Sequence, residues 1–242
     1  QALERAGRFD EAITSYGEAL AAADLAVAFV PQRGLRRSLR LLMARAAIEA
    51  GRPADALQWA QEALASQARG PVRLTLHQIA ALAATELGQL DLAATHARQA
   101  AELATADGGP DAMVDTLAMR GLVALRRGDL AGAEALAQQA RAPGRMVARL
   151  RVLEAQLLQY RGQFREAAAL YAQFQSPPPA LVIHPELRDR YAAALGAIQQ
   201  GFCLARAGAF DEADSLLAMP NPVLDADRRM AGRRDALRVW ID

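Results

Sequence analysis

The amino-acid sequence predicts an all-α protein built as a solenoid of antiparallel helical hairpins. Three observations carry this prediction: a recurring six-residue phrase, an alanine-rich composition, and small apolar residues at helical spacing around each copy of the phrase. Successive copies lie 34 to 46 residues apart, a period typical of stacked helical pairs. The phrase is Gly-x-(Phe/Leu/Pro)-x-x-Ala, and its copies begin at Gly7, Gly51, Gly88, Gly128, Gly162 and Gly208.

The composition favours a folded helical chain. Of 242 residues, 52% are hydrophobic and 23% charged, which is ample for an apolar core. Alanine dominates the apolar share, and it is both the strongest helix former and small enough to let helices approach closely. No run approaches the roughly 20 apolar residues of a membrane helix. The opening residues, QALERAGRFDEA, carry charges of both signs where a secretory signal needs an apolar core.

Charge and cysteine content bound the setting of the chain. The net charge is +1 and every one of the 28 basic residues is Arg, so the balance requires no acidic partner. A single cysteine, Cys203, excludes an internal disulfide and, with no secretory signal, predicts a cytoplasmic setting. Because the chain opens at Gln1 with a short helical stub before Gly7, we expect it to be part of a longer polypeptide.

Each glycine separates two expected helices. In the helix after it, small or apolar residues recur at the fifth, ninth and twelfth positions, which share one helical face. In the helix before it, the residue seven positions back is always small, so the two helices can touch. The fifth positions are Ala12, Ala56, Ala93, Ala133, Ala167 and Ala213, several copies repeat Ala at the twelfth (Ala19, Ala63, Ala100, Ala140), and the small residues before the turn are Ala44, Ala81, Gly121, Ala155 and Gly201.

Turn signals fall where consecutive hairpins should join, at 31–34, 69–71, 107–110 and 143–144. The longest connection, SPPPALVIHP at 176–185, is too proline-rich for a helix. After Gly208 the second helix should be cut short at Met219-Pro220, and an Arg-rich helix should follow over 224–240. We therefore predict a single domain over 1–242, with about six hairpins and a C-terminal helix.

This pattern resembles the tetratricopeptide repeat (TPR), whose two-helix unit has a small residue, a turn glycine, an aromatic two residues later and alanines at these offsets. Phe9-Asp10-Glu11-Ala12 and Phe210-Asp211-Glu212-Ala213 match its most typical turn. The resemblance covers essentially the whole chain and implies a right-handed superhelical solenoid with a concave and a convex side. The copies are degenerate, since Arg120, Glu154 and Gln200 stand where the family has a large apolar residue.

In this family the first helix of each hairpin lines the concave groove. Carried over, residues at set distances before each turn glycine form the expected protein- or peptide-binding groove, with an apolar middle that includes Leu125 and Ile198. The alternative is that lengthened helices bury many of these positions between repeats. The candidate groove residues are Arg45, Glu49, Gln78, Leu82, Glu86, Leu122, Arg126, Arg149, Gln156, Tyr160, Phe202 and Arg206.

Two other binding modes are disfavoured. Family members that grip a terminal carboxylate use Lys and Asn, but this chain has no Lys and its single Asn is Asn221. Arg clusters at 33–40, 145–151 and 228–238 suggest nucleic acid, but 27 acidic residues are interleaved along the chain. We expect the C-terminal cluster to be a surface where the array meets other domains of its own polypeptide.

Catalysis has little support in the sequence. His77, His96 and His184 are scattered over different repeats with no close pairing that would suggest a metal site. Cys203 is interpreted as a small buried thiol, and a Cys203–His184 pair lacks an orienting third residue. No glycine-rich phosphate loop precedes a helix. We therefore expect no enzymatic activity, no metal and no cofactor.

The expected function is a non-catalytic scaffold or sensor that binds an amphipathic protein segment or peptide in its groove, with no membrane contact. Degenerate Ala- and Arg-rich arrays of this kind look like regulatory regions of large bacterial signalling proteins. The alternative is a regulatory array of a caspase-like (CHAT) peptidase or of an ATPase-containing transcription regulator, with the activity residing outside this segment.

Overall fold

The computed structural model describes residues 2–5, 8–25, 33–66, 69–107, 109–144, 147–173, 185–220 and 228–241. Within these ranges the regular structure is helical, without strands, which confirms the predicted all-α class. The helices form two compact units, Gln1–Val147 and Ala148–Asp242, called unit 1 and unit 2. One continuous domain over 1–242 stays a prediction. None of the described helices is both long and apolar enough to cross a membrane.

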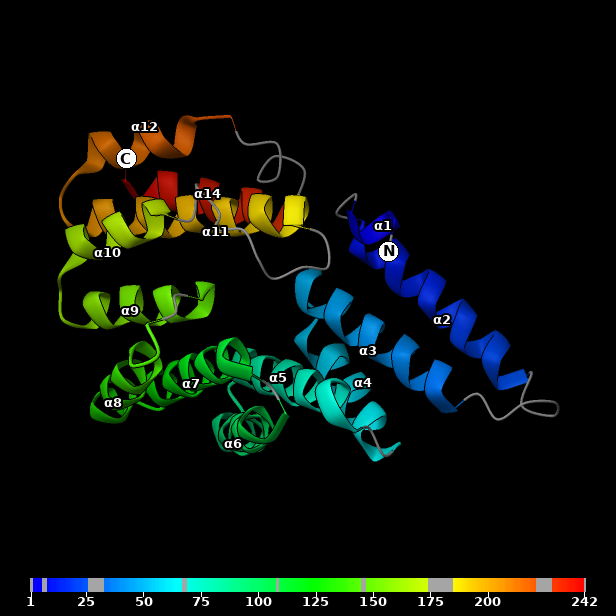
Figure 1. Ribbon diagram of the computed structural model, residues 1–242. Helices are drawn as coiled ribbons and strands as arrows, with labels where there is room; N and C mark the ends of the chain where they lie inside the picture. Colours follow the sequence, from blue (N-terminus) through cyan, green and yellow to red (C-terminus); the bar gives the residue numbers. More distant parts are fainter. Residues whose placement is uncertain are drawn as a thin grey trace. The chain divides into compact units, whose positions relative to one another are not determined.

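Unit 1 is a row of antiparallel hairpins (Figure 1). Each helix packs against the next along the chain, and the first helices of neighbouring hairpins also touch, α3 with α5 and α5 with α7. This is the nearest-neighbour packing expected of stacked repeats. The hairpins are α1 (Ala2–Arg5) with α2 (Phe9–Leu25), α3 (Arg33–Glu49) with α4 (Pro53–Ala65), α5 (Gly70–Glu86) with α6 (Leu90–Asp107), and α7 (Gly109–Arg126) with α8 (Leu130–Arg141).

Unit 2 repeats the same arrangement and ends in a lone helix. Its hairpins are α9 (Ala148–Tyr160) with α10 (Phe164–Ala172), and α11 (Pro185–Arg206) with α12 (Phe210–Ala218). The second of these ends just before Met219-Pro220, as predicted. Helix α14 (Arg228–Ile241) packs on both α11 and α12. It corresponds to the predicted C-terminal helix, of which 224–227 lie outside the described residues.

The turn glycines end the first helix of each hairpin by a specific backbone geometry. Gly88 has φ of 73°, a left-handed conformation that costs glycine little. Its N–H donates to the Thr85 carbonyl at 3.1 Å, and the Gln89 N–H donates to the Ala84 carbonyl at 2.8 Å. This pair of bonds is a Schellman motif, which satisfies carbonyls left open at the helix end. It recurs at the turns that begin at Gly51, Gly128, Gly162 and Gly208.

Small side chains meet across each hairpin, as the spacing predicts. Ala81 of α5 and Ala93 of α6 are fully buried, and so are their counterparts in the neighbouring hairpins. Of the alanines at the twelfth position, Ala63, Ala100 and Ala140 are buried and Ala19 is exposed. The buried counterparts of Ala81 and Ala93 are Ala12, Ala44, Ala56, Gly121, Ala133, Ala155, Ala167, Gly201 and Ala213.

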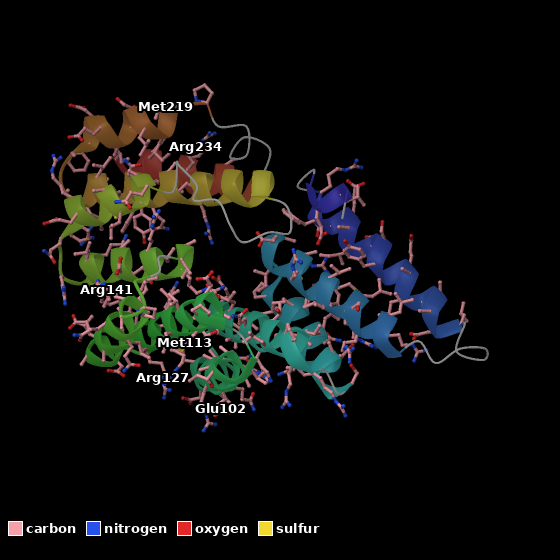
Figure 2. The ribbon with its side chains drawn as sticks, viewed as in Figure 1. Glu102, Met113, Arg127, Arg141, Met219 and Arg234 are labelled. Atoms are coloured by element: carbon pink, nitrogen blue, oxygen red, sulfur yellow. The ribbon has the colours of Figure 1, made fainter. Side chains whose placement is uncertain are left out.

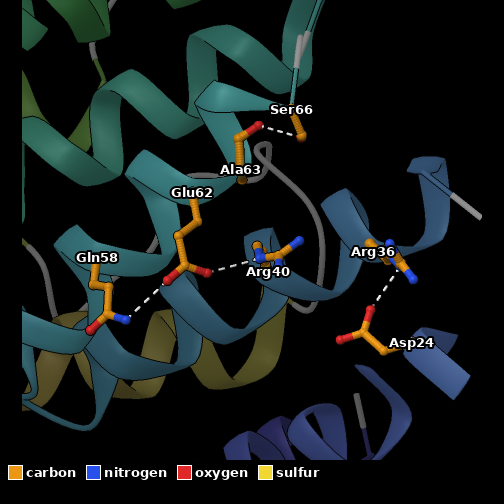
Figure 3. Close-up of polar contacts among 7 residues, drawn as sticks. All are labelled: Asp24, Arg36, Arg40, Gln58, Glu62, Ala63 and Ser66. Atoms are coloured by element: carbon orange, nitrogen blue, oxygen red, sulfur yellow. Dashed lines mark hydrogen bonds and ion pairs between the residues drawn. The ribbon is translucent and has the colours of Figure 1, made fainter. Parts of the chain in front are cut away.

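Ion pairs join neighbouring helices at the surface of unit 1. Arg36 of α3 pairs with Asp24 of α2 at 2.8 Å, and Arg40 of α3 pairs with Glu62 of α4 at 2.9 Å (Figure 3). Side-chain exposure of these groups is 23–53%, so each pair is worth about 0–1 kcal/mol. Arg127, just after the end of α7, pairs with Asp91 of α6 at 2.9 Å, whereas the exposed side chain of Glu102 extends away from α6 (Figure 2). Apolar packing therefore carries the stability of the hairpins.

Replacement by Ala should change the free energy of unfolding in opposite directions at Gly201 and at Gly232. A Cβ at Gly201 of α11 would lie 2.9 Å from Cδ2 of Leu217, which is buried on α12, whereas a Cβ at Gly232 of α14 meets nothing within 4 Å. Replacing Gly by Ala in a helix gains up to about 1 kcal/mol, but overpacking costs about 1–3 kcal/mol. Gly201→Ala should therefore lower the free energy of unfolding by about 1 kcal/mol, and Gly232→Ala should raise it.

Urea unfolding followed by circular dichroism measures both changes. If Gly201→Ala were as stabilising as Gly232→Ala, the close approach of α11 and α12 would be wrong.

Candidate protein-binding surface

Every candidate groove residue lies on the first helix of a hairpin. Within each helix neighbouring candidates are four residues apart, or seven in the case of Arg149 and Gln156, and so share a face: Arg45 and Glu49 on α3, then Gln78, Leu82 and Glu86 on α5, followed by Leu122 and Arg126 on α7, all in unit 1. Arg149, Gln156 and Tyr160 on α9, and Phe202 and Arg206 on α11, belong to unit 2.

In unit 1 the candidate face is half polar and half apolar. Gln78 donates from Nε2 to Asp115 at 3.3 Å and to the Thr116 hydroxyl at 3.4 Å, which joins the faces of α5 and α7. Leu82 packs against the core and is half-buried, as is Leu122. Glu49, Glu86 and Arg126 are exposed, and Arg45 is half-buried.

In unit 2 the predicted anchors lie beside further aromatic rings. Phe202 is 37% exposed and stacks on Trp240 of α14, with ring centroids 6.4 Å apart. One turn along α11, the guanidinium of Arg206 lies over the ring of Phe164, 5.1 Å from its centroid. Such a cation–π contact is worth about 0.5–1 kcal/mol at an exposed site and fixes the direction of the charge. Tyr160, at the end of α9, is 60% exposed.

A hydrogen bond brings α9 and α11 together next to these anchors. Gln159, adjacent to Tyr160, donates from Nε2 to Sγ of Cys203, adjacent to Phe202, at 2.9 Å. Arg149 and Gln156, the other candidates on α9, are half-buried. We call the exposed side chains Tyr160, Phe202, Arg206 and Trp240, together with the half-buried Phe164 that lies under Arg206, the aromatic surface. Trp240 was missed by sequence reasoning, although its helix occupies the position of a further first helix against α11.

Two residues assigned to the apolar middle of the groove belong to the core instead. Leu125 and Ile198 are both buried. Leu125 lies three residues before its turn glycine and is 1% exposed, and Ile198 is 6% exposed. These two residues are therefore not part of an exposed groove, and the groove assignment was wrong for them.

The expectation that the histidines have no close pairing was also wrong. His77 of α5 and His96 of α6 belong to one hairpin, and their Nδ1 atoms lie 3.0 Å apart. The spacing contained a signal for this. His77 lies about one turn before Ala81 and His96 about one turn after Ala93, so both histidines are displaced from these alanines by the same distance away from the turn. His184 lies outside the described residues.

Comparisons with known proteins identify the fold. Over 96% of the chain and 85% of its counterpart, the structure matches that of a tetratricopeptide repeat protein from Parabacteroides merdae, with a TM-score of 0.58 and 16% identity. The chain has the tetratricopeptide repeat fold. A second match, BtubC (BKLC) from P. vanneervenii, has a TM-score of 0.53 and 16% identity over 94% of this chain and 92% of that one. No family model and no curated protein matches the sequence.

The reactive side chain that the sequence offers, Cys203, is enclosed within this TPR fold. Cys203 is fully buried, as predicted, and burial raises the pKa of its thiol, while the hydrogen bond from Gln159 acts in the opposite direction. A proposed partnership with His184 falls on residues outside the described ranges. In the part of the chain that the structure describes, no group of three or more His, Cys, Asp or Glu side chains is placed to hold a metal ion.

The burial of Cys203 predicts slow thiol chemistry. Because the thiolate is the reactive form and the side chain is 0% exposed, a disulfide reagent should modify the folded chain at pH 8 at least about 100-fold more slowly than the chain in urea. The chain has a single cysteine, so the absorbance of the released thiol reports on this site alone. Equal rates in the folded and unfolded states would show that the α9–α11 contact is open.

Proposed function

We propose that this chain is a non-catalytic module that binds a protein segment or peptide on the first helices of its repeats. The observation that carries the proposal is the aromatic surface: large side chains remain exposed on α9, α11 and α14 while alanines fill the adjacent core. A core that closes with small residues has no need of these rings. Exposed aromatic side chains next to arginine are the residue types that dominate binding energy at protein interfaces.

The geometry of the aromatic surface favours a partner with both apolar and acidic groups. The stack of Phe202 on Trp240 presents apolar area that is already ordered, so binding orders few further side chains. Arg206 is held over Phe164 with its guanidinium exposed, which leaves its donors directed at solvent. An amphipathic helix or extended segment that sets an apolar side chain beside a carboxylate fits both features.

The regulatory setting belongs to the same proposal. A module of this kind acts as the scaffold or sensor region of a larger bacterial signalling protein in the cytoplasm. The second candidate is the regulatory array of a CHAT peptidase or of an ATPase-containing transcription regulator, in which the aromatic surface would contact the enzyme domain of the same polypeptide. The full open reading frame distinguishes the two, since only the second requires a catalytic domain in the same chain.

A display experiment tests the proposed surface. Peptides selected from a random displayed library against the full chain should be enriched in aromatic or aliphatic residues next to Asp or Glu. Tyr160→Ala and Phe202→Ala should weaken binding of the selected peptides by roughly 30-fold or more, the loss expected at an interface anchor. Titration followed by the fluorescence of Trp240 measures the affinity, because that ring lies on Phe202.

Phe210→Ala is the matched control. Phe210 is a comparably exposed phenylalanine of unit 2, but it begins the second helix α12 and is absent from the aromatic surface. Its removal should leave affinity within about twofold, with helical content unchanged in all variants. If Phe210→Ala weakened binding as much as Phe202→Ala, or if Phe202→Ala bound normally, the first-helix surface would not be the binding site.

A further inference from the structure

The His77–His96 contact is a buried polar pair inside an interface otherwise made of small apolar side chains. His77 is 4% exposed and His96 8% exposed, and their ring centroids are 5.3 Å apart. Around them lie fully buried alanines of the same two helices, including Ala80, Ala81 and Ala97. The Nε2 atoms of both rings are buried and have no hydrogen-bond partner among the described residues.

The 3.0 Å Nδ1–Nδ1 contact requires a specific protonation state. One ring donates its Nδ1–H, and the other accepts with a lone pair on Nδ1; both rings are neutral as long as the Nε2 of the donor ring carries no proton. A first added proton goes to the free Nε2 of the donor ring, where no acceptor meets it. A second proton goes to the accepting Nδ1, which removes the hydrogen bond and sets two N–H groups and two positive charges against each other.

The surroundings do not compensate for this charge. Burial is the largest cause that lowers the pKa of His77, to about 4, followed by His96 and by Arg73 of the same helix. Burial also lowers the pKa of His96, while a hydrogen bond with the Gln99 side chain raises it by a smaller amount. Three acidic groups of this region are engaged elsewhere: Glu62 of α4 with Arg40 of α3, Asp91 of α6 with Arg127, and Asp115 of α7 with Gln78.

We propose that the His77–His96 pair is an acid-sensitive latch that holds α5 against α6 when neutral and opens this hairpin of unit 1 when it takes up protons. The direction follows from linkage. The pKa of His77 is about 4 in the folded chain and 6.5 ordinarily, so the unfolded chain binds more protons between these values. The contribution of the pair is complete above about pH 6.5 and declines as the pH falls towards 4.

Opening at this point would affect the whole of unit 1. Helices α5 and α6 supply many of the buried residues of its core, and they contact α3, α4 and α7. In a stacked array a repeat is stabilised mainly by its neighbours, so loss of one central hairpin contact weakens those on both sides. The latch is independent of what the chain binds, and it adds a response to acidification to whatever surface the array presents.

The test uses the full chain with Trp240→Phe, which leaves Trp59 as the single tryptophan. Trp59 lies on α4 and packs against the core of unit 1. Its fluorescence reports the melting temperature at pH 7.5, 6.0, 5.0 and 4.5, in this parent and in a variant that also carries His77→Gln and His96→Gln. Glutamine can form a hydrogen bond but does not titrate in this range, so carboxylate effects shared by both chains cancel.

The parent should lose on the order of 5–10 °C more than the double variant between pH 7.5 and 4.5. Parallel loss in the two chains overturns the latch. A second measurement needs no variant of the pair. The Cε1–H resonances of the chain's three histidines are titrated by NMR, and the His184→Gln variant identifies the resonance of His184. His77 should stay neutral down to about pH 5, the pKa of His96 should lie below the ordinary histidine value, and charging of the pair should coincide with loss of the folded signals. Titration of both near pH 6.5 in the folded chain overturns the proposal.

Discussion

The contact between small side chains across each hairpin is the constraint on which the rest of the structure depends. Ala81 and Ala93 belong to one core and are fully buried, and in the last hairpin the small residue Gly201 lies so close to the larger Leu217 that an added methyl group would be 2.9 Å from its Cδ2. Burying a methyl group contributes only about 0.8 kcal/mol, so no single contact stabilises a hairpin alone. The contacts add up because each unit repeats them in register, and the Schellman turn after each first helix sets that register.

Features that depend on local sequence were predictable for the same reason. A glycine with φ near 75° ends a helix wherever the chain must reverse, and the alanine positions follow by counting from it. The sequence therefore indicated the turns, the paired helices and the end of α12. It did not predict that Leu125 and Ile198 are buried. The family's distances from the turn glycine state which face of a helix a residue is on, but they do not state how the neighbouring repeat packs against that face.

The candidate site was predictable only in part. Tyr160, Phe202 and Arg206 lie on exposed first-helix faces, whereas their use as anchors stays a prediction. Trp240 and the His77–His96 pair depend on contacts between segments 38 and 19 residues apart, which no spacing rule for one helix describes. Predicting the histidine pair would have required counting outward from the turn along both helices at once, as the alanine positions do. The periodicity of a single helix does not give this information.

An alanine interface also explains why polar and aromatic groups have such different places in this chain. Most side chains between paired helices are small, and Phe202 and Trp240 stack outside that contact, where they are available to a partner, while Tyr171 is enclosed in the core of unit 2. The two imidazoles of unit 1 are also enclosed, and they face each other as a hydrogen-bonded pair. Each buried polar atom without a partner costs about 1–3 kcal/mol, so the Nδ1–Nδ1 contact limits this cost to the two Nε2 atoms. The same closeness that makes the neutral pair favourable makes the charged pair unfavourable, since no solvent separates the two rings.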